Sequence, residues 1–313
     1  MRRRHALRCG FALLAVLWIM VAASALGLTL ALSARESVAA ARNRVSSTEA
    51  IWRAHDCLER ARAAIGVALE EAMAQSSAKV TSWLVLDTVV SRSGFSASDL
   101  CTLQLRPSGV ALDVNAADPE MLGRLLRTVG VGGARADSMT DALLDWRDAD
   151  DLPRPHGAEH SWYAAAGRMV PRNAVLASDG EIALVRGFES VAGLDGLLTV
   201  EPARVVLPRA PMPVIAALPG IDDEALARVA ERRLHDAWPA DPLALTAELS
   251  SNSRASLLPH YAELARLTTA EPEAWIVTSR GRAVASSVSA VIEVRLVRAG
   301  ARAAIVRWRS WVE

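Results

Sequence analysis

The first feature of the chain is an apolar run of helical length near its N-terminus. Residues 11–32 contain no charged side chain and no proline. At about 1.5 Å per residue, a helix of this length spans the roughly 30 Å hydrocarbon core of a bilayer. Arginines at positions 2, 3, 4 and 8 precede the run and favour a cytoplasmic N-terminus. The pattern predicts a transmembrane segment over residues 11–32, with the bulk of the chain outside the cytoplasm.

Helical periodicity continues beyond this segment. No proline occurs before Pro107, so one helix can run from the membrane into solvent. Ile51, Leu58 and Ile65 recur every seven residues, with small alanines between them, and form a narrow apolar stripe. The run is shorter than the three or four heptads of a typical coiled coil. We therefore expect the stripe to lie on a sheet of the same chain rather than in a free coiled coil.

Alternation with a period of two indicates strands in two places. The stretch "LCTLQLRPSGVALDV" (residues 100–114) has two alternating runs around Pro107 and Gly109, which predicts a hairpin with Cys101 on its buried face. Near the C-terminus, "AWIVTS", "VSAVIEVRLV" and "AAIVRWRSWV" alternate in the same way, with a turn at "RAGAR". We expect these C-terminal segments to be strands of an antiparallel sheet.

The middle of the chain has helical periodicity. Asn115 and Asp118 are predicted N-caps, and Pro119 suits a first helical turn. The order of elements predicts an α+β fold, in which a long N-terminal helix packs on an antiparallel sheet and a large all-helical domain interrupts the sheet domain. The predicted segments are 33–114 for the first part of the sheet domain, 115–210 for the inserted domain, and 211–313 for a helix-hairpin-helix-like segment followed by the C-terminal strands.

The helix-hairpin-helix-like segment is "ALPGIDDEALARVAERR" (residues 217–233). Gly220 makes the turn, and Asp222 to Glu224 cap the second helix. Such a module can bind DNA, but it should then be locally basic. Acidic residues slightly outnumber basic ones here. The pattern favours a structural use of the hairpin, with no nucleic acid as partner, and a membrane-anchored DNA-binding receptor remains the alternative.

Composition and the absence of catalytic motifs exclude several classes of function. The formal net charge is +0, so no global field attracts the protein to nucleic acid or anionic lipid. The sequence contains no GxSxG, no HExxH and no phosphate-binding glycine loop followed by lysine. We therefore predict a non-enzymatic protein.

Two cysteines follow the apolar run, and neither belongs to a CxxC pair, which argues against a zinc site. Outside the cytoplasm, Cys57 and Cys101 can form a disulfide. A helix lying across the predicted hairpin brings Cys57 within reach of Cys101, which favours the disulfide. Two buried free thiols remain the other interpretation.

The leader itself carries a more specific pattern, because the basic residues end at Gly10 and Phe11 begins the apolar run. This arrangement resembles the class III leader of type IV pilins and type II secretion pseudopilins. The resemblance implies that residues 1–10 are removed by a prepilin peptidase between Gly10 and Phe11, that Phe11 is methylated, and that the apolar helix stays as an anchor. Most such proteins carry a glutamate where this chain has Ala15. A subunit without that glutamate is expected at the end of a filament.

Several further stretches, in order, resemble the minor pseudopilin family known as general secretion pathway protein K. They are "LDVNAADPEML", "LLDWRDADDLPRPHGAEHSWY", "LVRGF" and "VIAALPGID". The resemblance implies a pilin-like domain carrying a large helical insertion, at the tip of a type II secretion pseudopilus. It implies an inner-membrane, single-pass protein with a periplasmic bulk, which initiates and caps pseudopilus assembly. The implied partners are the minor pseudopilins of the I, J and H types. A type IV pilus minor pilin is a further alternative.

The same resemblance points to a metal site in the inserted domain. Family members bind calcium there, and Asp145, Asp148, Asp150 and Glu159 are the implied Ca²⁺ ligands. Closely spaced carboxylates on an irregular loop supply the oxygens that Ca²⁺ requires. His160 stands where another acid is expected. The alternative is a solvated loop whose acids are neutralised by neighbouring arginines.

Overall fold

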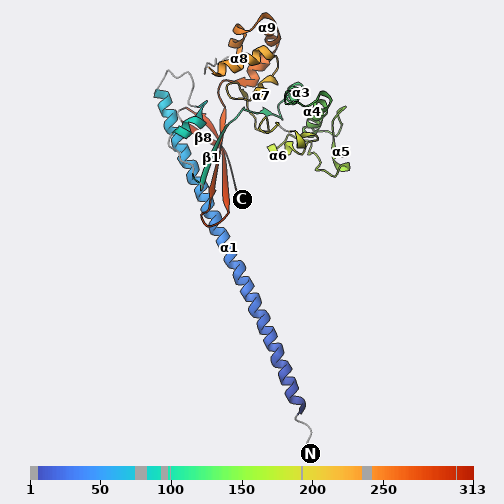
Figure 1. The fold of residues 1–313 in the computed structure, drawn as a ribbon, viewed down its shortest axis with the longest axis vertical. Coiled ribbons are helices and arrows are strands. Elements are labelled where there is room, and N and C mark those ends of the chain that lie inside the picture. Colours follow the sequence, from blue (N-terminus) through green and yellow to red (C-terminus); the bar gives the residue numbers. More distant parts are fainter. Residues whose placement is uncertain are drawn as a thin grey trace, which may run out of the picture.

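One uninterrupted helix dominates the molecule (Figure 1). The computed structural model describes residues 6–74, 83–92, 98, 100–191, 193–234, 242–300 and 302–313. Helix α1 runs from Ala6 to Ala74, and its N-terminal half extends far from the rest of the chain. The expected continuation of the helix beyond the apolar run is confirmed.

A four-stranded antiparallel sheet packs against the C-terminal half of α1. Its order is β1-β6-β7-β8, and its strands are β1 (Cys101–Pro107), β6 (Ala274–Arg282), β7 (Ser289–Ala299) and β8 (Arg302–Val312). Leu58 and Ile65 of α1 are buried in one cluster with Val277 of β6 and Val294 of β7. Ile51 differs from its expected place, because it is exposed at the edge of this contact. The C-terminal strands are confirmed.

The hairpin predicted around Pro107 and Gly109 is wrong. Strand β1 pairs with β6, so that Pro107 lies opposite Trp275. The backbone N–H of Ser108 continues this pairing by donating to Ala274 O at 2.8 Å. The second alternating run becomes β2 (Leu112–Asp113), which pairs in parallel with β3 (Leu198–Thr199). The presumed turn is therefore the point at which the chain leaves the sheet.

A helical insert occupies the chain between β1 and β6. Its helices are α3 (Pro119–Thr128), α4 (Gly133–Arg147), α5 (His160–Ala165), α6 (Asp179–Ile182), α7 (Met212–Ala216), α8 (Asp223–Leu234), α9 (Ser251–Leu257) and α10 (Tyr261–Leu267). In the described part of the insert, the 3₁₀ turns η1 (Phe188–Ser190), η2 (Pro242–Glu248) and η3 (Leu258–His260) lie among these helices. The insert also contains strand pairs, β2 with β3, and β4 (Val205–Val206) with β5 (Thr268–Thr269), so it is not purely helical.

The insert has its own hydrophobic core. One cluster of buried residues runs from Leu112 to Leu264 and continues across residue 210. The predicted cap at Asp118 is present, since its Oδ1 accepts from the N–H of Met121 at 2.8 Å. Asn115 does not cap a helix, because its side-chain amide instead exchanges hydrogen bonds with the backbone of Leu176. This exchange ties the start of the insert to a later loop.

Charged side chains fix the insert on the sheet domain. Glu201 forms ion pairs with Arg295 of β7 and Arg307 of β8. On the other side, Arg209 pairs with Asp87 of α2 (Leu86–Arg92) and lies 5.6 Å from the ring centroid of Trp275. These contacts hold the insert at the end of the sheet farthest from the N-terminus (Figure 1).

Candidate functional site

The N-terminal anchor is the first candidate site. Gly10 and Phe11 lie within α1, so the expected processing point falls inside a continuous helix. One helix of the described chain is long and apolar enough to cross a membrane, with a mean hydropathy of 2.3 in its most apolar window and none of that window buried. The position of Ala15 lies on this exposed part of α1. Processing at Gly10 stays a prediction.

The acidic loop connects the end of α4 to the start of α5. Helix α4 ends at Arg147 with Asp148 as its C-cap, and Glu159 is the N-cap residue of α5. Asp148, Asp150 and Glu159 each offer a carboxylate oxygen, and these oxygens lie within 4.8 Å of one another. Three of the four expected ligands are thus brought together by the two helix ends and the turn between them.

Asp145, the fourth expected ligand, lies beside this group but serves a different contact. Its fully buried carboxylate accepts a hydrogen bond from Arg154 Nη1 at 2.7 Å. Arg154 also pairs with Asp148 at 2.5 Å. Gly157 allows this packing, since a Cβ atom there would lie 1.9 Å from Asp145 Oδ2. The sequence interpretation in which Arg147 and Arg154 neutralise the loop is thus correct for Arg154, whereas Arg147 donates to the backbone oxygens of Val114 and Ala117.

Several oxygens of the acidic loop are buried without a hydrogen-bond partner among the residues that the structure describes. They are Asp148 Oδ1 and both carboxylate oxygens of Glu159, whose residue is only 2% exposed. Burial, followed by repulsion from Asp145 and Asp148, raises the pKa of Glu159 from 4.5 to about 7. Buried charged oxygens without hydrogen bonds are costly, and a bound cation removes that cost. The loop therefore fits a hard cation at Asp148, Asp150 and Glu159.

Asn173, which follows α5 in the chain, forms hydrogen bonds to the middle of the acidic loop. Its side-chain Nδ2 donates to Asp150 O at 2.7 Å and to Asp151 Oδ1 at 2.9 Å. Asn173 has a φ of 50°, in the left-handed region, which asparagine tolerates better than most residues. No sequence pattern indicated this contact, because it joins positions on separate loops.

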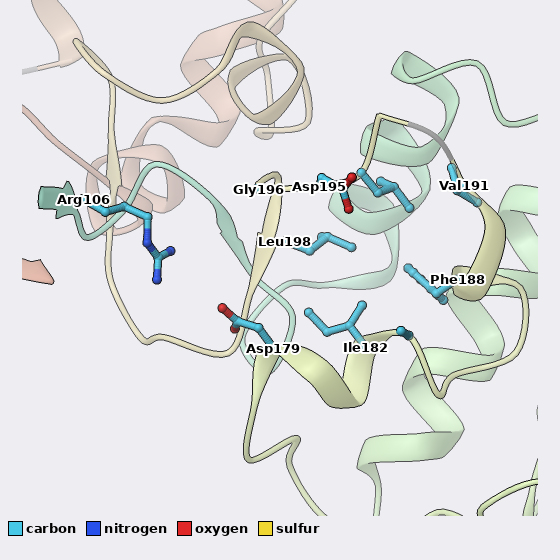
Figure 2. Close-up of a pocket in the computed structure, with 10 residues that line it drawn as sticks. Arg106, Asp179, Ile182, Phe188, Val191, Asp195, Gly196 and Leu198 are labelled. Atoms are coloured by element: carbon cyan, nitrogen blue, oxygen red, sulfur yellow. The ribbon is translucent and has the colours of Figure 1, made fainter. Parts of the chain in front are cut away.

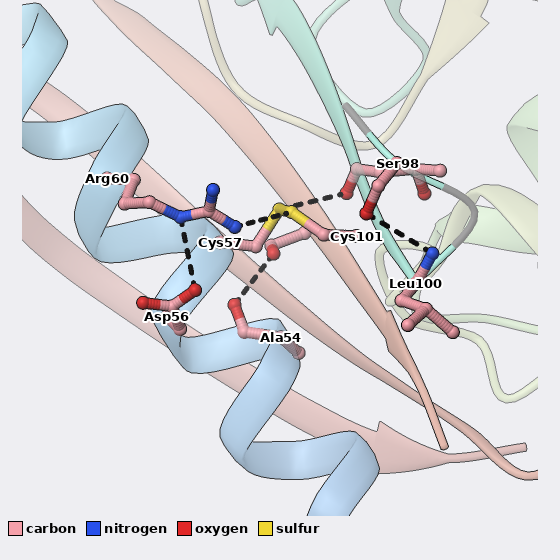
Figure 3. The surroundings of a disulfide bond; sticks show 9 residues. Ala54, Asp56, Cys57, Arg60, Ser98, Leu100 and Cys101 are labelled. Carbon is pink, nitrogen blue, oxygen red and sulfur yellow. Dashed lines mark hydrogen bonds and ion pairs between the residues drawn. A yellow bond between two sulfur atoms is a disulfide. The ribbon is translucent and has the colours of Figure 1, made fainter. Parts of the chain in front are cut away.

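Cys57 and Cys101 form a disulfide that ties α1 to the first residue of β1 (Figure 3). Their Cα atoms are 5.9 Å apart. Arg60, one turn further along α1, lies beside the bridge and pairs with Asp56 at 3.1 Å. Backbone hydrogen bonds between Ser98 and Cys101 close the chain just before β1. The bridge thus fixes the sheet on the helix at one edge.

The helix-hairpin-helix-like segment forms α7, a turn and α8. Gly220 has the expected left-handed conformation, with φ 72°, and Asp222 accepts from the N–H of Ala225 at 2.9 Å. The turn itself is buried, and a Cβ at Gly220 would lie 3.1 Å from both Leu257 Cα and His260 Cβ. A phosphate-binding hairpin must present its turn amides to solvent. This hairpin packs inside the insert instead.

A cavity of about 370 Å³ opens between the end of β1 and the insert (Figure 2). Phe188 and Leu198 belong to its apolar wall, and Arg106 and Asp179 lie at its polar side. The carboxylate of Asp179 already accepts from Thr199 Oγ1 at 3.0 Å. Arg106 makes no ion pair with any residue that the structure describes.

Comparisons with known proteins agree with this geometry. Residues 99–203 match the family model described as Type II secretion system (T2SS), protein K. A chain of the crystal structure of the GspK–GspI–GspJ complex from the type 2 secretion system of enterotoxigenic Escherichia coli has a similar fold, with a TM-score of 0.59 and 15% sequence identity. The likeness covers 87% of this chain and 99% of that chain. No curated protein is significantly similar in sequence.

Proposed function

The chain belongs, through residues 99–203, to the family of type II secretion system protein K, and from this premise we propose that it is the minor pseudopilin at the tip of a type II secretion pseudopilus. It starts assembly of the pseudopilus and caps it. The family is a structural component of a secretion system, and this role needs no catalytic residues.

The main support for the proposed tip position is the placement of the insert. The insert lies beyond the end of the sheet that is farthest from the apolar part of α1 (Figure 1). Glu201 and Arg209 attach it to the sheet domain through ion pairs. A subunit arriving above would meet this body instead of the open end of a pilin-like domain. Ala15 adds to the argument, because it offers no carboxylate to the N-terminus of a subunit above it.

The proposed partners are pilin-like proteins of the same membrane. The similar fold comes from a complex of GspK, GspI and GspJ, which supports minor pseudopilins of the I and J types as partners here. An H-type subunit would join the pseudopilus below. The single apolar span of α1 supports anchoring in the inner membrane after a prepilin peptidase cuts at Gly10, with the sheet and insert in the periplasm.

Counting subunits along the pseudopilus tests this function. We expect gold-labelled antibodies against the insert to mark one end of each pseudopilus, and we expect far fewer pseudopili in cells that lack the chain. Labelling along the whole length would contradict the capping role. Unchanged pseudopilus numbers without the chain would contradict the initiating role.

We further propose that the acidic loop holds Ca²⁺. Asp148, Asp150 and Glu159 would be its carboxylate ligands, and Asp145 would stay with Arg154. The partnerless oxygens of Asp148 and Glu159 support this assignment. When bound, the ion supplies positive charge between the end of α4 and the start of α5. It therefore acts as a structural brace of the insert.

Calorimetry on the periplasmic part of the chain, with and without calcium, tests the site. Asp148→Asn and Glu159→Gln should each weaken Ca²⁺ binding and remove the rise in Tm that calcium gives. Asp137→Asn is the matched control, since this exposed acid of α4 pairs only loosely with Arg127 at 3.6 Å. Equal calcium binding by all variants would exclude the assigned ligands.

A further inference from the structure

The stretch "LVRGF" (residues 184–188) follows α6 and lies against the acidic loop of the insert. Two of its apolar residues are anchored in the core of the insert, since Val185 is fully buried and Phe188 is only 7% exposed. Arg186 stands between them and is half-buried. The stretch therefore forms a fixed base from which the side chain of Arg186 reaches the loop.

Arg186 contacts the acidic loop at Gly157. Its side-chain Nη1 donates a hydrogen bond to Gly157 O at 3.0 Å. The guanidinium group lies over the ring of Trp162 in α5, with Cζ 5.0 Å from the ring centroid, and this cation–π contact keeps the group in place. Gly157 is two residues before Glu159, and Ala158 between them is buried. The path of the chain into Glu159 is thus fixed from Arg186.

Tyr163 supports the same residue from the other side. The backbone N–H of Arg186 donates to Tyr163 Oη at 2.9 Å. The backbone N–H of Tyr163 in turn donates to Glu159 O at 3.2 Å, and that of Trp162 donates to the same oxygen at 2.9 Å. Tyr163 is fully buried, so its ring cannot follow a moving loop. Contacts of Arg186 therefore support the backbone of Glu159 both before and after it.

This support matters because the side chain of Glu159 is not oriented by hydrogen bonds. Among the residues that the structure describes, none donates to either of its carboxylate oxygens, although the residue is only 2% exposed. Asp148 differs, since one of its oxygens is paired with Arg154 at 2.5 Å. The direction of the Glu159 carboxylate thus depends on the backbone that carries it. Residues that orient metal ligands from behind commonly contribute about 10- to 100-fold to metal affinity.

We propose that Arg186 is a positioning residue for the Ca²⁺ site of the acidic loop. It holds the chain at Gly157 and Tyr163. The carboxylate of Glu159 is thereby kept near the other two proposed ligands, and one ligand oxygen from each of the three lies within 4.8 Å of the others. Arg186 acts through the backbone of the loop and not by contact with the ion. This inference rests on the proposed calcium site and adds to it a residue that no pattern of carboxylates indicates.

Arg168 is a matched arginine without a contact to the loop. Its Cζ lies 5.7 Å from the centroid of the same Trp162 ring, and its Nη2 donates to Leu184 O at 2.8 Å. It also pairs with Glu189 at 3.2 Å. Both arginines thus combine a cation–π contact with a hydrogen bond to a backbone oxygen, but only Arg186 bonds to the acidic loop. A purely structural role would make the two substitutions equivalent for calcium binding.

Calcium titration of the full chain in detergent micelles tests the proposal. Isothermal titration calorimetry with CaCl₂, after a chelator has removed bound metal, gives the Kd. We expect Arg186→Gln to raise the Kd about tenfold or more, and Arg168→Gln to leave it nearly unchanged. Arg186→Lys keeps a donor and a positive charge over Trp162, so it should recover part of the affinity. Equal Kd values for Arg186→Gln and Arg168→Gln would overturn the proposal.

Tyr163→Phe keeps the test decisive if the loss of an arginine loosens the whole insert. It removes only the oxygen that accepts from the N–H of Arg186, and it keeps the ring, whose centroid lies 5.1 Å from that of Trp146 in α4. We expect the Kd to rise by a smaller factor than in Arg186→Gln. The Tm of each variant in chelator measures the structural effect separately. A Kd that follows the Tm across all variants would contradict a positioning role.

The outcomes separate this inference from the proposed calcium site. If the unaltered chain binds no calcium, the proposed site itself fails. If calcium binds and Glu159→Gln weakens the binding, but Arg186→Gln and Tyr163→Phe do not, the calcium site stands and the positioning role of Arg186 is wrong.

Discussion

Gly281 of β6 lies directly under the backbone of α1. A Cβ at this position would be 2.2 Å from Ala54 N and 2.4 Å from Ala50 O, which are backbone atoms that cannot turn away. Ser279, on the same strand, donates its hydroxyl to Ala54 O at 2.7 Å and keeps the helix close. The absence of a side chain at Gly281 thus sets the distance between helix and sheet.

We predict that Gly281→Ala lowers the free energy of unfolding by about 1–3 kcal/mol, because the helix must move away from the sheet. Chemical denaturation of the chain after the apolar run, from residue 33 onward, measures this change. Gly66→Ala is the control in the same helix, since a Cβ at Gly66 meets nothing within 4 Å. That substitution should stabilise α1 by about 0.5–1 kcal/mol through helix propensity. A neutral Gly281→Ala would show that the contact is looser than the packing indicates.

Glu159 makes stability depend on pH near neutrality. Its pKa rises from 4.5 to about 7 in the folded state, so the folded protein binds this proton more tightly than the unfolded chain does. In the presence of a chelator, stability should therefore fall as the pH increases from about 4.5 to 7 and level off above that. Thermal unfolding across this range measures the effect. Glu159→Gln should flatten the slope, and an unchanged slope in that variant would assign the effect to other groups.

The acidic residues of the loop could be predicted from the sequence. Which of them pairs with an arginine, and which has oxygens free for a cation, could not. Four carboxylates on a proline-broken loop indicate an oxygen-rich site whatever the exact path of the chain. The path decides that Arg154 turns back to Asp145, and that the oxygens of Glu159 are buried without a partner. Such choices depend on tertiary packing around Gly157, which no local spacing encodes.

At the scale of elements, the junction between insert and sheet depends on Glu201. Burial alone would raise the pKa of Glu201, but hydrogen bonds from Arg307 and Arg295 outweigh it and hold the pKa below its usual value. The stabilisation by this group is therefore present above pH about 4.5 and is lost as the pH falls through the lowered pKa. Arg295 and Arg307 lie opposite each other on β7 and β8, and the carboxylate of Glu201 offsets the repulsion between them.

We predict that Glu201→Gln costs about 1–3 kcal/mol, since it leaves the partly buried Arg295 without its counter-charge and Arg307 with only Glu293 at 3.7 Å. Hydrogen exchange should show faster opening at β3 and β7 in this variant. Glu271→Gln is the control, because its pair with Arg298 is exposed on both sides, and it should change stability by no more than about 0.5 kcal/mol. If the two substitutions changed the free energy of unfolding equally, the ion pairs of Glu201 with Arg295 and Arg307 would have no special role.

The elements themselves show what periodicity can and cannot reveal. The apolar run of α1 and the alternation in β7 and β8 identify helix and strands, because each pattern extends over several turns or residue pairs. The alternation at Cys101–Leu105 correctly indicates a strand, but it cannot name the partner. Pairing with β6 joins positions that are far apart in the sequence. The Pro107–Gly109 stretch is compatible both with a hairpin turn and with an exit from the sheet.

At the scale of the whole molecule, the two hydrophobic cores are separate. One cluster joins α1 to the sheet, and the other fills the insert. The insert leaves and re-enters the sheet at neighbouring points, since Ser108 N and Ala274 O are 2.8 Å apart. A short turn can therefore replace the chain between Pro107 and Ala274 without breaking the register of β1 and β6. The proposed capping role can then be tested on a chain that keeps the sheet domain and lacks the insert.

We predict that a variant with this replacement still folds and still forms the Cys57–Cys101 bridge. Without the insert it no longer blocks the subunit above, but Ala15 still offers no carboxylate. Adding Ala15→Glu should then allow several copies per pseudopilus, whereas either change alone should leave one. Quantitative immunolabelling of sheared pseudopili measures the copy number. One copy in the doubly altered chain would mean that neither the insert nor residue 15 sets the tip position, and that a feature of the sheet domain does.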